Sequence, residues 1–127
     1  MRPLYLLGAL SLTALGCDAT RVLSDFGDPY QLLSQDDQAA VLDGTRLLVP
    51  VQYGGGCAEH TFALRSDLDA DSATVWLHHD ANGDACEAFI TETVSAELPA
   101  PVAAAARVTL RAPAGLGSDA ETTVALR

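Results

Sequence analysis

The sequence contains no lysine: its seven basic residues are all arginine, against 17 acidic residues, and the formal net charge is −10. An acidic surface repels the phosphate groups of nucleic acids and the anionic head groups of lipids. The charge balance therefore excludes a nucleic-acid partner and a basic membrane-binding patch. At 127 residues the chain has the length of one domain.

The sequence also lacks an apolar run of the roughly 20 residues that a membrane-spanning helix requires. Its N-terminal apolar stretch, Leu4 to Leu15, follows Arg2 and precedes Gly16. A basic start, a short apolar stretch and a small residue before the cleavage point are typical of a secretory signal peptide. Residues 1–16 are therefore expected to be removed on export, which leaves 17 acidic residues against six arginines.

The residue after this stretch is a cysteine. Ala14-Leu15-Gly16-Cys17 resembles the lipobox of bacterial lipoproteins, in which the first mature residue is a lipid-bearing cysteine. It departs from the usual pattern, which has leucine three residues before the cysteine and a residue smaller than Leu15 next. Ala14 and Gly16 also suit an ordinary signal peptidase, so this alternative stays open. Lipidation would place the protein in the cell envelope, anchored to the extracytoplasmic side of a membrane.

The cysteine count bears on the same question. The chain has three cysteines, and in an oxidising compartment an odd thiol can pair between chains. Lipidation of Cys17 removes one thiol and leaves Cys57 and Cys86, which we expect to form a disulfide. Such a bridge closes a loop of about 30 residues and would contribute about 3–4 kcal/mol to stability. Lipidation and the disulfide therefore support each other.

Residues 17–31 are expected to be a tether, and residues 32–127 a single β-domain. Gly27-Asp28-Pro29 marks a turn within the tether. Phe26 and Tyr30 either end the tether or belong to the first packed strand, and the sequence does not separate these alternatives.

Short segments of alternating apolar and polar residues predict an all-β fold, a small antiparallel β-sandwich (Ig-like) of about six or seven strands. Asp43-Gly44 between two apolar runs predicts a hairpin turn. Pro50 has no N–H to donate, so its strand is expected at a sheet edge or a bulge, while Ser66–Ser72 is expected to be an acidic loop. One strand should end at Leu42, and the others should lie within Thr45–Tyr53, Glu59–Arg65, Ala73–His79, Cys86–Val94, Arg107–Arg111 and Thr122–Leu126.

One stretch resembles a known group. Gly55-Gly56-Cys57-x-x-His60, followed by His79-Asp80 and by Asp84-x-Cys86, is similar to a motif of small exported bacterial proteins, many of them lipoproteins. The resemblance covers roughly residues 45–94. The group has no established activity, so the resemblance implies a domain shape and no catalytic residues.

A metal site is the rival interpretation of the same stretch. His60 with His78 or His79 and the carboxylates Asp80 and Asp84 has ligand types that suit zinc or copper. Cysteine ligation would need reduced thiols, which export disfavours. A calcium loop at Asp80-x-Asn82-x-Asp84 is not favoured, because the glycine expected after the third ligand is absent.

No catalytic motif stands out. The sequence has neither a Gly-x-Ser-x-Gly elbow nor a phosphate-binding loop with its lysine. We therefore expect a non-enzymatic envelope lipoprotein without a cofactor, acting as a binding or structural module for an envelope protein partner. An extracytoplasmic metal-binding protein is the alternative.

Overall fold

The computed structural model describes residues 25–34 and 38–127. The expected signal peptide, Cys17 and most of the expected tether lie outside the described residues. Among those residues, no helix is long and apolar enough to cross a membrane.

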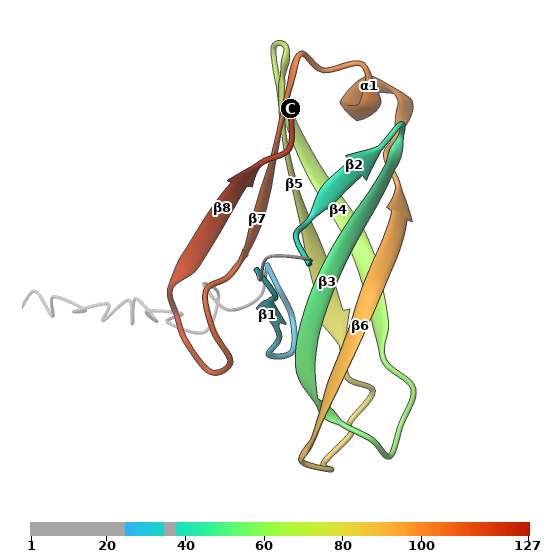
Figure 1. Cartoon of the computed structure of the whole chain (residues 1–127), viewed down its shortest axis with the longest axis vertical. Coiled ribbons are helices and arrows are strands. Elements are labelled where there is room, and N and C mark those ends of the chain that lie inside the picture. Colours follow the sequence, from blue (N-terminus) through green and yellow to red (C-terminus); the bar gives the residue numbers. More distant parts are fainter. Residues whose placement is uncertain (1–24, 35–37) are drawn as a thin grey trace, which may run out of the picture.

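The described residues form two four-stranded sheets that pack as a sandwich (Figure 1). In the first sheet β3 pairs with β1, β2 and β6, and the second has the order β4-β5-β7-β8. The expected all-β sandwich is therefore confirmed, with eight strands in the described part of the chain where about six or seven were expected. The elements are β1 (Gln31–Leu32), β2 (Val41–Asp43), β3 (Arg46–Gly55), β4 (Thr61–Asp69), β5 (Ser72–Asp80), β6 (Ala88–Glu97), α1 (Ala100–Ala103), β7 (Arg107–Pro113) and β8 (Glu121–Ala125).

One strand pair departs from the expected antiparallel arrangement. β5 and β7 run parallel, in a register from Ser72↔Arg107 to Trp76↔Arg111. Parallel neighbours need a crossover connection, and here the chain passes through β6 of the other sheet and through α1 before it returns. This route lets β7 enter the second sheet at the same end as β5.

The core lies between the two sheets and follows the predicted alternation. Leu47, Val49, Val51 and Tyr53 of β3 are all buried, as is the opposing series on β5. Burying one such aliphatic side chain contributes about 1.5–3 kcal/mol, so each strand adds several such contributions. The β5 series consists of Ala73, Val75, Leu77 and His79.

Pro50 does not place its strand at an edge, contrary to the expectation. β3 is an interior strand, with β6 along one side and β1 and β2 along the other, and its pairing with β6 runs without a break from Arg46 to Gly55. The N–H of Leu33 donates to the Pro50 carbonyl at 2.9 Å. Because the N and O atoms of a strand residue face the same side, the proline nitrogen faces the gap between β1 and β2 and costs no bond to β6.

Two turn predictions had different outcomes. The Asp43-Gly44 hairpin is confirmed, since β2 pairs with β3 and Gly44 has φ +64°. The expected loop at Ser66–Ser72 is wrong, because β4 continues to Asp69 and pairs with β5 up to a tight turn at Ala70. The acidic side chains of this segment are exposed, so their charges do not oppose backbone pairing.

The segment before β1 belongs to the core, which decides between the alternatives for Phe26 and Tyr30. Both side chains are buried, and the Tyr30 hydroxyl donates to the Leu77 carbonyl of β5 at 2.7 Å. Burial raises the pKa of Tyr30 well above its ordinary value. The Arg111 guanidinium lies over the Phe26 ring, 5.4 Å from its centre. The packed chain therefore includes residues on both sides of the Gly27-Asp28-Pro29 turn.

Tyr30→Phe removes this buried hydrogen bond and should lower the free energy of unfolding by about 1–2 kcal/mol. The matched control is Tyr53→Phe, because the Tyr53 ring is buried but its hydroxyl lies near the exposed Glu92 carboxylate. That change should cost less than about 1 kcal/mol. Urea unfolding measures both values, and equal losses would contradict a special role for the Tyr30 hydroxyl.

Candidate functional site

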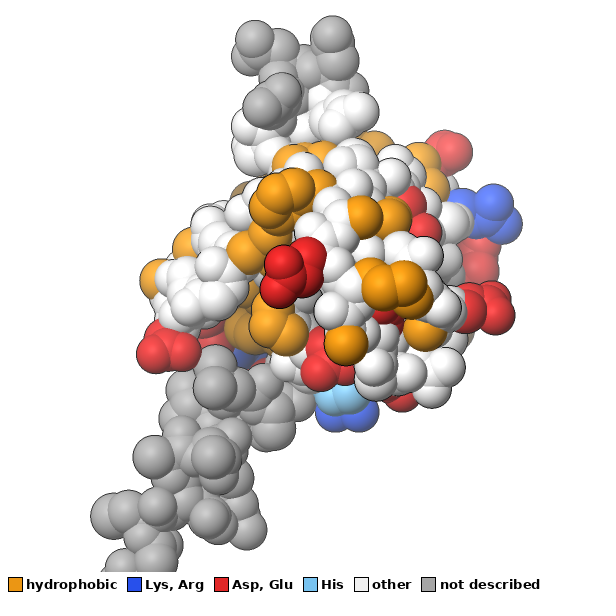
Figure 2. All heavy atoms as spheres, turned by 90° about the horizontal axis from the view of Figure 1, so that it is seen from below, with side chains coloured by type: hydrophobic (Ala, Val, Ile, Leu, Met, Phe, Trp, Pro, Cys, Tyr) orange, Lys and Arg blue, Asp and Glu red, His pale blue; other side chains and the backbone are white. Residues whose placement is uncertain are grey.

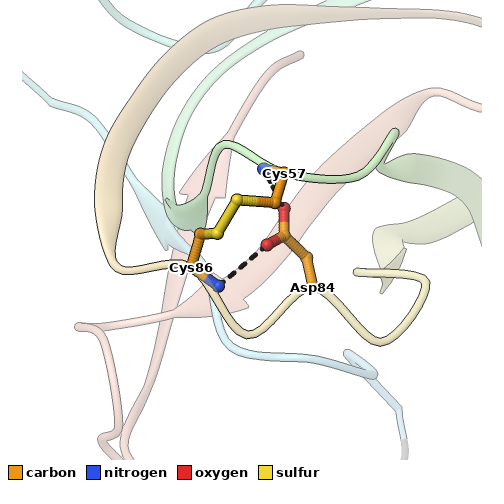
Figure 3. Close-up of side chains that lie close together, drawn as sticks. All are labelled: Cys57, Asp84 and Cys86. Atoms are coloured by element: carbon orange, nitrogen blue, oxygen red, sulfur yellow. Dashed lines mark hydrogen bonds between the residues drawn. A yellow bond between two sulfur atoms is a disulfide. The ribbon is translucent and has the colours of Figure 1, made fainter.

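The loops after β3 and β5 lie at one end of the molecule (Figure 1), where five of the residues singled out by the sequence meet: His60, His79, Asp84, Cys57 and Cys86. Cys57 and Cys86 form the expected disulfide across these two loops, with their Cα atoms 5.8 Å apart (Figure 3). In the chain-entropy model, a bridge spanning 29 residues contributes about 3–4 kcal/mol. The disulfide therefore fixes the loop after β3 to the loop after β5.

The Asp84 carboxylate joins the same two loops through hydrogen bonds. Its Oδ2 accepts the backbone N–H groups of Gly56, Cys57 and Ala58, each at 3.0 Å, and its Oδ1 accepts that of Cys86 at 2.9 Å. Two of these bonds are drawn in Figure 3. The side chain has no exposed surface. Four backbone donors on one buried carboxylate define a rigid anion-binding nest, here filled by the protein itself.

A series of hydrogen bonds through two histidine rings leads inward from this carboxylate. His60 Nε2 lies 2.9 Å from Asp84 Oδ2, and His60 Nδ1 lies 2.8 Å from His79 Nε2. His79 Nδ1 in turn lies 3.0 Å from the carbonyl oxygen of Asp28. Four residues from three separate segments are thus connected in one line.

The pKa values of the residues in this hydrogen-bonded series follow from their contacts. The hydrogen bond from His60, followed by the backbone donors, holds the pKa of the Asp84 carboxyl well below its usual range. Burial lowers the pKa of His79. Asp84 is therefore ionised and His79 neutral around pH 7.

Aromatic rings hold the two imidazoles in place. Phe62 of β4 stacks on His79 with ring centres 4.4 Å apart and planes 4° apart, and Tyr53 of β3 stacks on His60 at 4.5 Å. Tyr30 meets His79 edge-on at 5.8 Å. These contacts exclude water from the His60–His79 bond and fix the ring planes that it requires.

The structure brings together three of the four candidate metal ligands. His60 is hydrogen-bonded to both His79 and Asp84, whereas Asp80 is exposed and accepts the N–H of Asn82 in a local turn. Every ring nitrogen of the two histidines already has a protein partner, so an ion would have to replace these bonds. The geometry therefore does not identify these residues as metal ligands.

His78, the other candidate histidine, lies apart from this chain. Neighbouring side chains on a strand point to opposite faces, so His78 leaves β5 on the face away from His79. The sequence did not single out Asp28 as a site residue. Its only signal was the Gly27-Asp28-Pro29 turn, which does not reveal that a backbone carbonyl would face His79.

The protein surface is hollowed beside the hydrogen-bonded series that runs from Asp84 to Asp28. An open depression of about 560 Å³ has the exposed Phe89 of β6 at its margin, with 73% of that residue accessible. Figure 2 views this end and shows hydrophobic side chains gathered there with acidic ones among them. The lining residues include Asp28, Gly54, His79, Asp84, Glu87 and Phe89.

The sequence matches no protein-family model and no curated protein. The structure is similar to that of a NigD-like immunity protein from Bacteroides caccae, with a TM-score of 0.55, 19% sequence identity, and coverage of 77% of this chain and 50% of that one. This likeness supports the sandwich fold, and the chain spans about half the length of that protein.

Substitution of Gly55 tests how tightly the site is packed. A Cβ on Gly55 would lie 2.5 Å from His60 Nε2 and 2.9 Å from Asp84 Oδ2, whereas one on Gly54 would meet no atom within 4 Å. Gly55→Ala should therefore push His60 off Asp84 and cost about 1–3 kcal/mol of stability.

Gly54→Ala is the matched control, since it makes the same change one residue earlier in β3. It should leave stability within about 1 kcal/mol of the wild type, or raise it. Thermal unfolding of both variants gives the comparison. Similar losses would indicate that the backbone of β3, and not the His60–Asp84 contact, requires glycine.

Proposed function

We propose that the chain is a lipid-anchored protein of the bacterial cell envelope whose β-sandwich acts as a non-enzymatic binding module. The signal-peptide pattern and Cys17 support the anchor, and the disulfide suits an oxidising compartment. The Bacteroides caccae protein with a similar fold is described as an immunity protein. A protective binding role of that kind is compatible with this proposal.

The polar groups at the site are bonded to one another, which supports a non-enzymatic role. The ring nitrogens of His60 and His79 and both oxygens of Asp84 are engaged in internal hydrogen bonds, and the sulfurs of Cys57 and Cys86 are bonded to each other. Covalent catalysis needs a nucleophile and a base that can reach a substrate. Here these groups hold the loops together instead.

The single observation that carries the binding role is the exposed Phe89 beside the depression. Carboxylates line the same hollow, among them those of Asp28 and Glu87, and the chain as a whole is strongly acidic. An aromatic face next to carboxylates favours a cation, because the ring and the carboxylates both attract positive charge. We therefore assign the depression to a basic side chain, above all arginine, of an envelope protein partner.

The anchor is tested by metabolic labelling with a tagged fatty acid. Wild-type protein should carry the label and sediment with membranes, whereas Cys17→Ser should lose the label and become soluble, since no thiol remains to be acylated. The double variant Cys57→Ser/Cys86→Ser controls for general effects of cysteine loss and should keep the label. Labelling that persists in Cys17→Ser would contradict the anchor.

The binding surface is tested with a hexa-arginine peptide, followed by fluorescence anisotropy, with a hexa-glutamine peptide as the neutral probe. Phe89→Ala should weaken arginine-peptide binding by about two- to fivefold, the size of an exposed cation–π contact. Glu87→Gln should weaken it and reduce its dependence on salt.

Leu68→Ala serves as the matched control, because Leu68 is an exposed apolar residue of β4 outside the depression. It should leave binding unchanged. Equal weakening by Leu68→Ala and Phe89→Ala, or equal binding of the two peptides, would contradict the assigned surface.

A further inference from the structure

The chain from Asp84 to Asp28 contains three hydrogen bonds, and each needs one proton between its two heavy atoms. The bonds are Asp84–His60, His60–His79 and His79 to the Asp28 carbonyl, at 2.8–3.0 Å. Two neutral imidazoles carry only two N–H protons, and both ends of the chain, a carboxylate and a carbonyl oxygen, are acceptors. The chain is therefore one proton short when both histidines are neutral.

With both rings neutral, one bond must bring two lone pairs face to face. If both rings donate toward Asp84, the lone pair of His79 Nδ1 faces the Asp28 carbonyl. If both donate toward Asp28, the lone pair of His60 Nε2 faces the Asp84 carboxylate. If each ring donates outward, to Asp84 and to Asp28, the lone pairs of His60 Nδ1 and His79 Nε2 face each other at 2.8 Å. The side chains of His60 and Asp84 are almost fully buried, as is His79, so in each arrangement the facing lone pairs are shielded from solvent.

A third proton satisfies every bond, and the surroundings decide where it lies. Asp84 Oδ2 accepts three backbone N–H groups besides His60, which favours the ionised carboxylate over the acid. His79 is surrounded by rings and has a carbonyl, not a carboxylate, as its outer partner. The proton therefore belongs on His60, next to the negative charge, while His79 stays neutral and donates from Nδ1.

We propose that His60 and His79 together hold one extra proton in the folded protein, and that this proton couples the segment at Asp28 to the disulfide-linked loops at Asp84. When the proton is lost, one of the three bonds must break. The floor of the depression, which includes His79 and Asp84, then becomes more negative by one unit. The structure thus contains a proton-controlled link between the segment that follows the expected tether and the candidate binding surface.

The other groups that face the imidazole pair are neutral around pH 7 or hold fixed charges. The phenols of Tyr30 and Tyr53 have raised pKa values, in both cases chiefly through burial. The Asp28 carboxylate accepts the N–H of Ala81 and so points at the loop after β5. The groups packed around the pair are Asp28 and Tyr30 of the N-terminal segment, Tyr53 of β3, Phe62 of β4 and Asp84 of the loop after β5.

The proposal predicts the sign of the pH dependence of stability. In the unfolded chain both imidazoles lose their protons near pH 6.5. Above this value the folded protein holds one proton more than the unfolded chain, so stability falls as pH rises. Below it the unfolded chain holds one proton more, because His79 stays neutral in the fold, and stability falls as pH decreases. Stability should therefore peak near pH 6.5, with about a tenfold change in the unfolding constant per pH unit on either side.

The test combines urea unfolding between pH 5 and 9 with ¹⁵N NMR of the histidine rings, both on the full chain. His78→Gln is the matched control, since it removes a histidine outside the chain of bonds, and it should keep the peak. His60→Gln retains an amide donor toward Asp84 but has no titratable ring. It should abolish the loss of stability above pH 6.5.

NMR of the wild type decides the question even if His60→Gln does not fold. At pH 7.5 one ring should show two protonated nitrogens and another the neutral form with hydrogen on Nδ1. Three neutral rings at pH 7.5, or stability that stays level from pH 6.5 to 8.5, would overturn the proposal. Neither readout depends on lipidation or on a binding partner, so the proposal can fail without affecting the proposed function.

Discussion

The buried carboxylate of Asp84 is the interaction on which this end of the molecule depends. It accepts backbone N–H groups from the loop after β3 and from its own loop, and it pairs with His60. A charge without exposed surface is costly unless it is hydrogen-bonded, and here four bonds reach Oδ2 and one reaches Oδ1. The disulfide adds a covalent link between the same loops, but only the carboxylate determines how they face the histidine pair.

Much of the fold could be predicted from local patterns, because alternation along a strand directly reports which face is buried. The series from Leu47 to Tyr53 is of this kind, whereas the Cys57–Cys86 pair was predicted from the number of cysteines. The interior position of Pro50 could not be predicted. It depends on where β1 ends and β2 begins along the side of β3 that faces away from β6. Likewise, the parallel β5–β7 pair results from a crossover that no local pattern encodes.

The candidate site was only partly visible in the sequence for a similar reason. His60, His79 and Asp84 have side chains of recognisable chemistry, so they could be singled out before their contacts were known. Asp28 contributes a carbonyl oxygen to His79, and any residue could supply that atom. The spacing of residues that commonly bind metals also suggested a metal site. In the fold, however, His60 and His79 are hydrogen-bonded to each other through their ring nitrogens, and Asp80 lies outside the site.

The crossover between β5 and β7 has a consequence for the order in which the chain can fold. Residues 107–113 form β7, which lies beside β5 in the second sheet, but they are synthesised after β6 and α1. Until they arrive, much of the inner edge of β5 has no strand beside it, and unpaired edges readily recruit strands from other chains. Asp28 and Phe26 already pair with β5 at His79. The N-terminal segment thus covers one end of the β5 edge before β7 pairs with the rest of it.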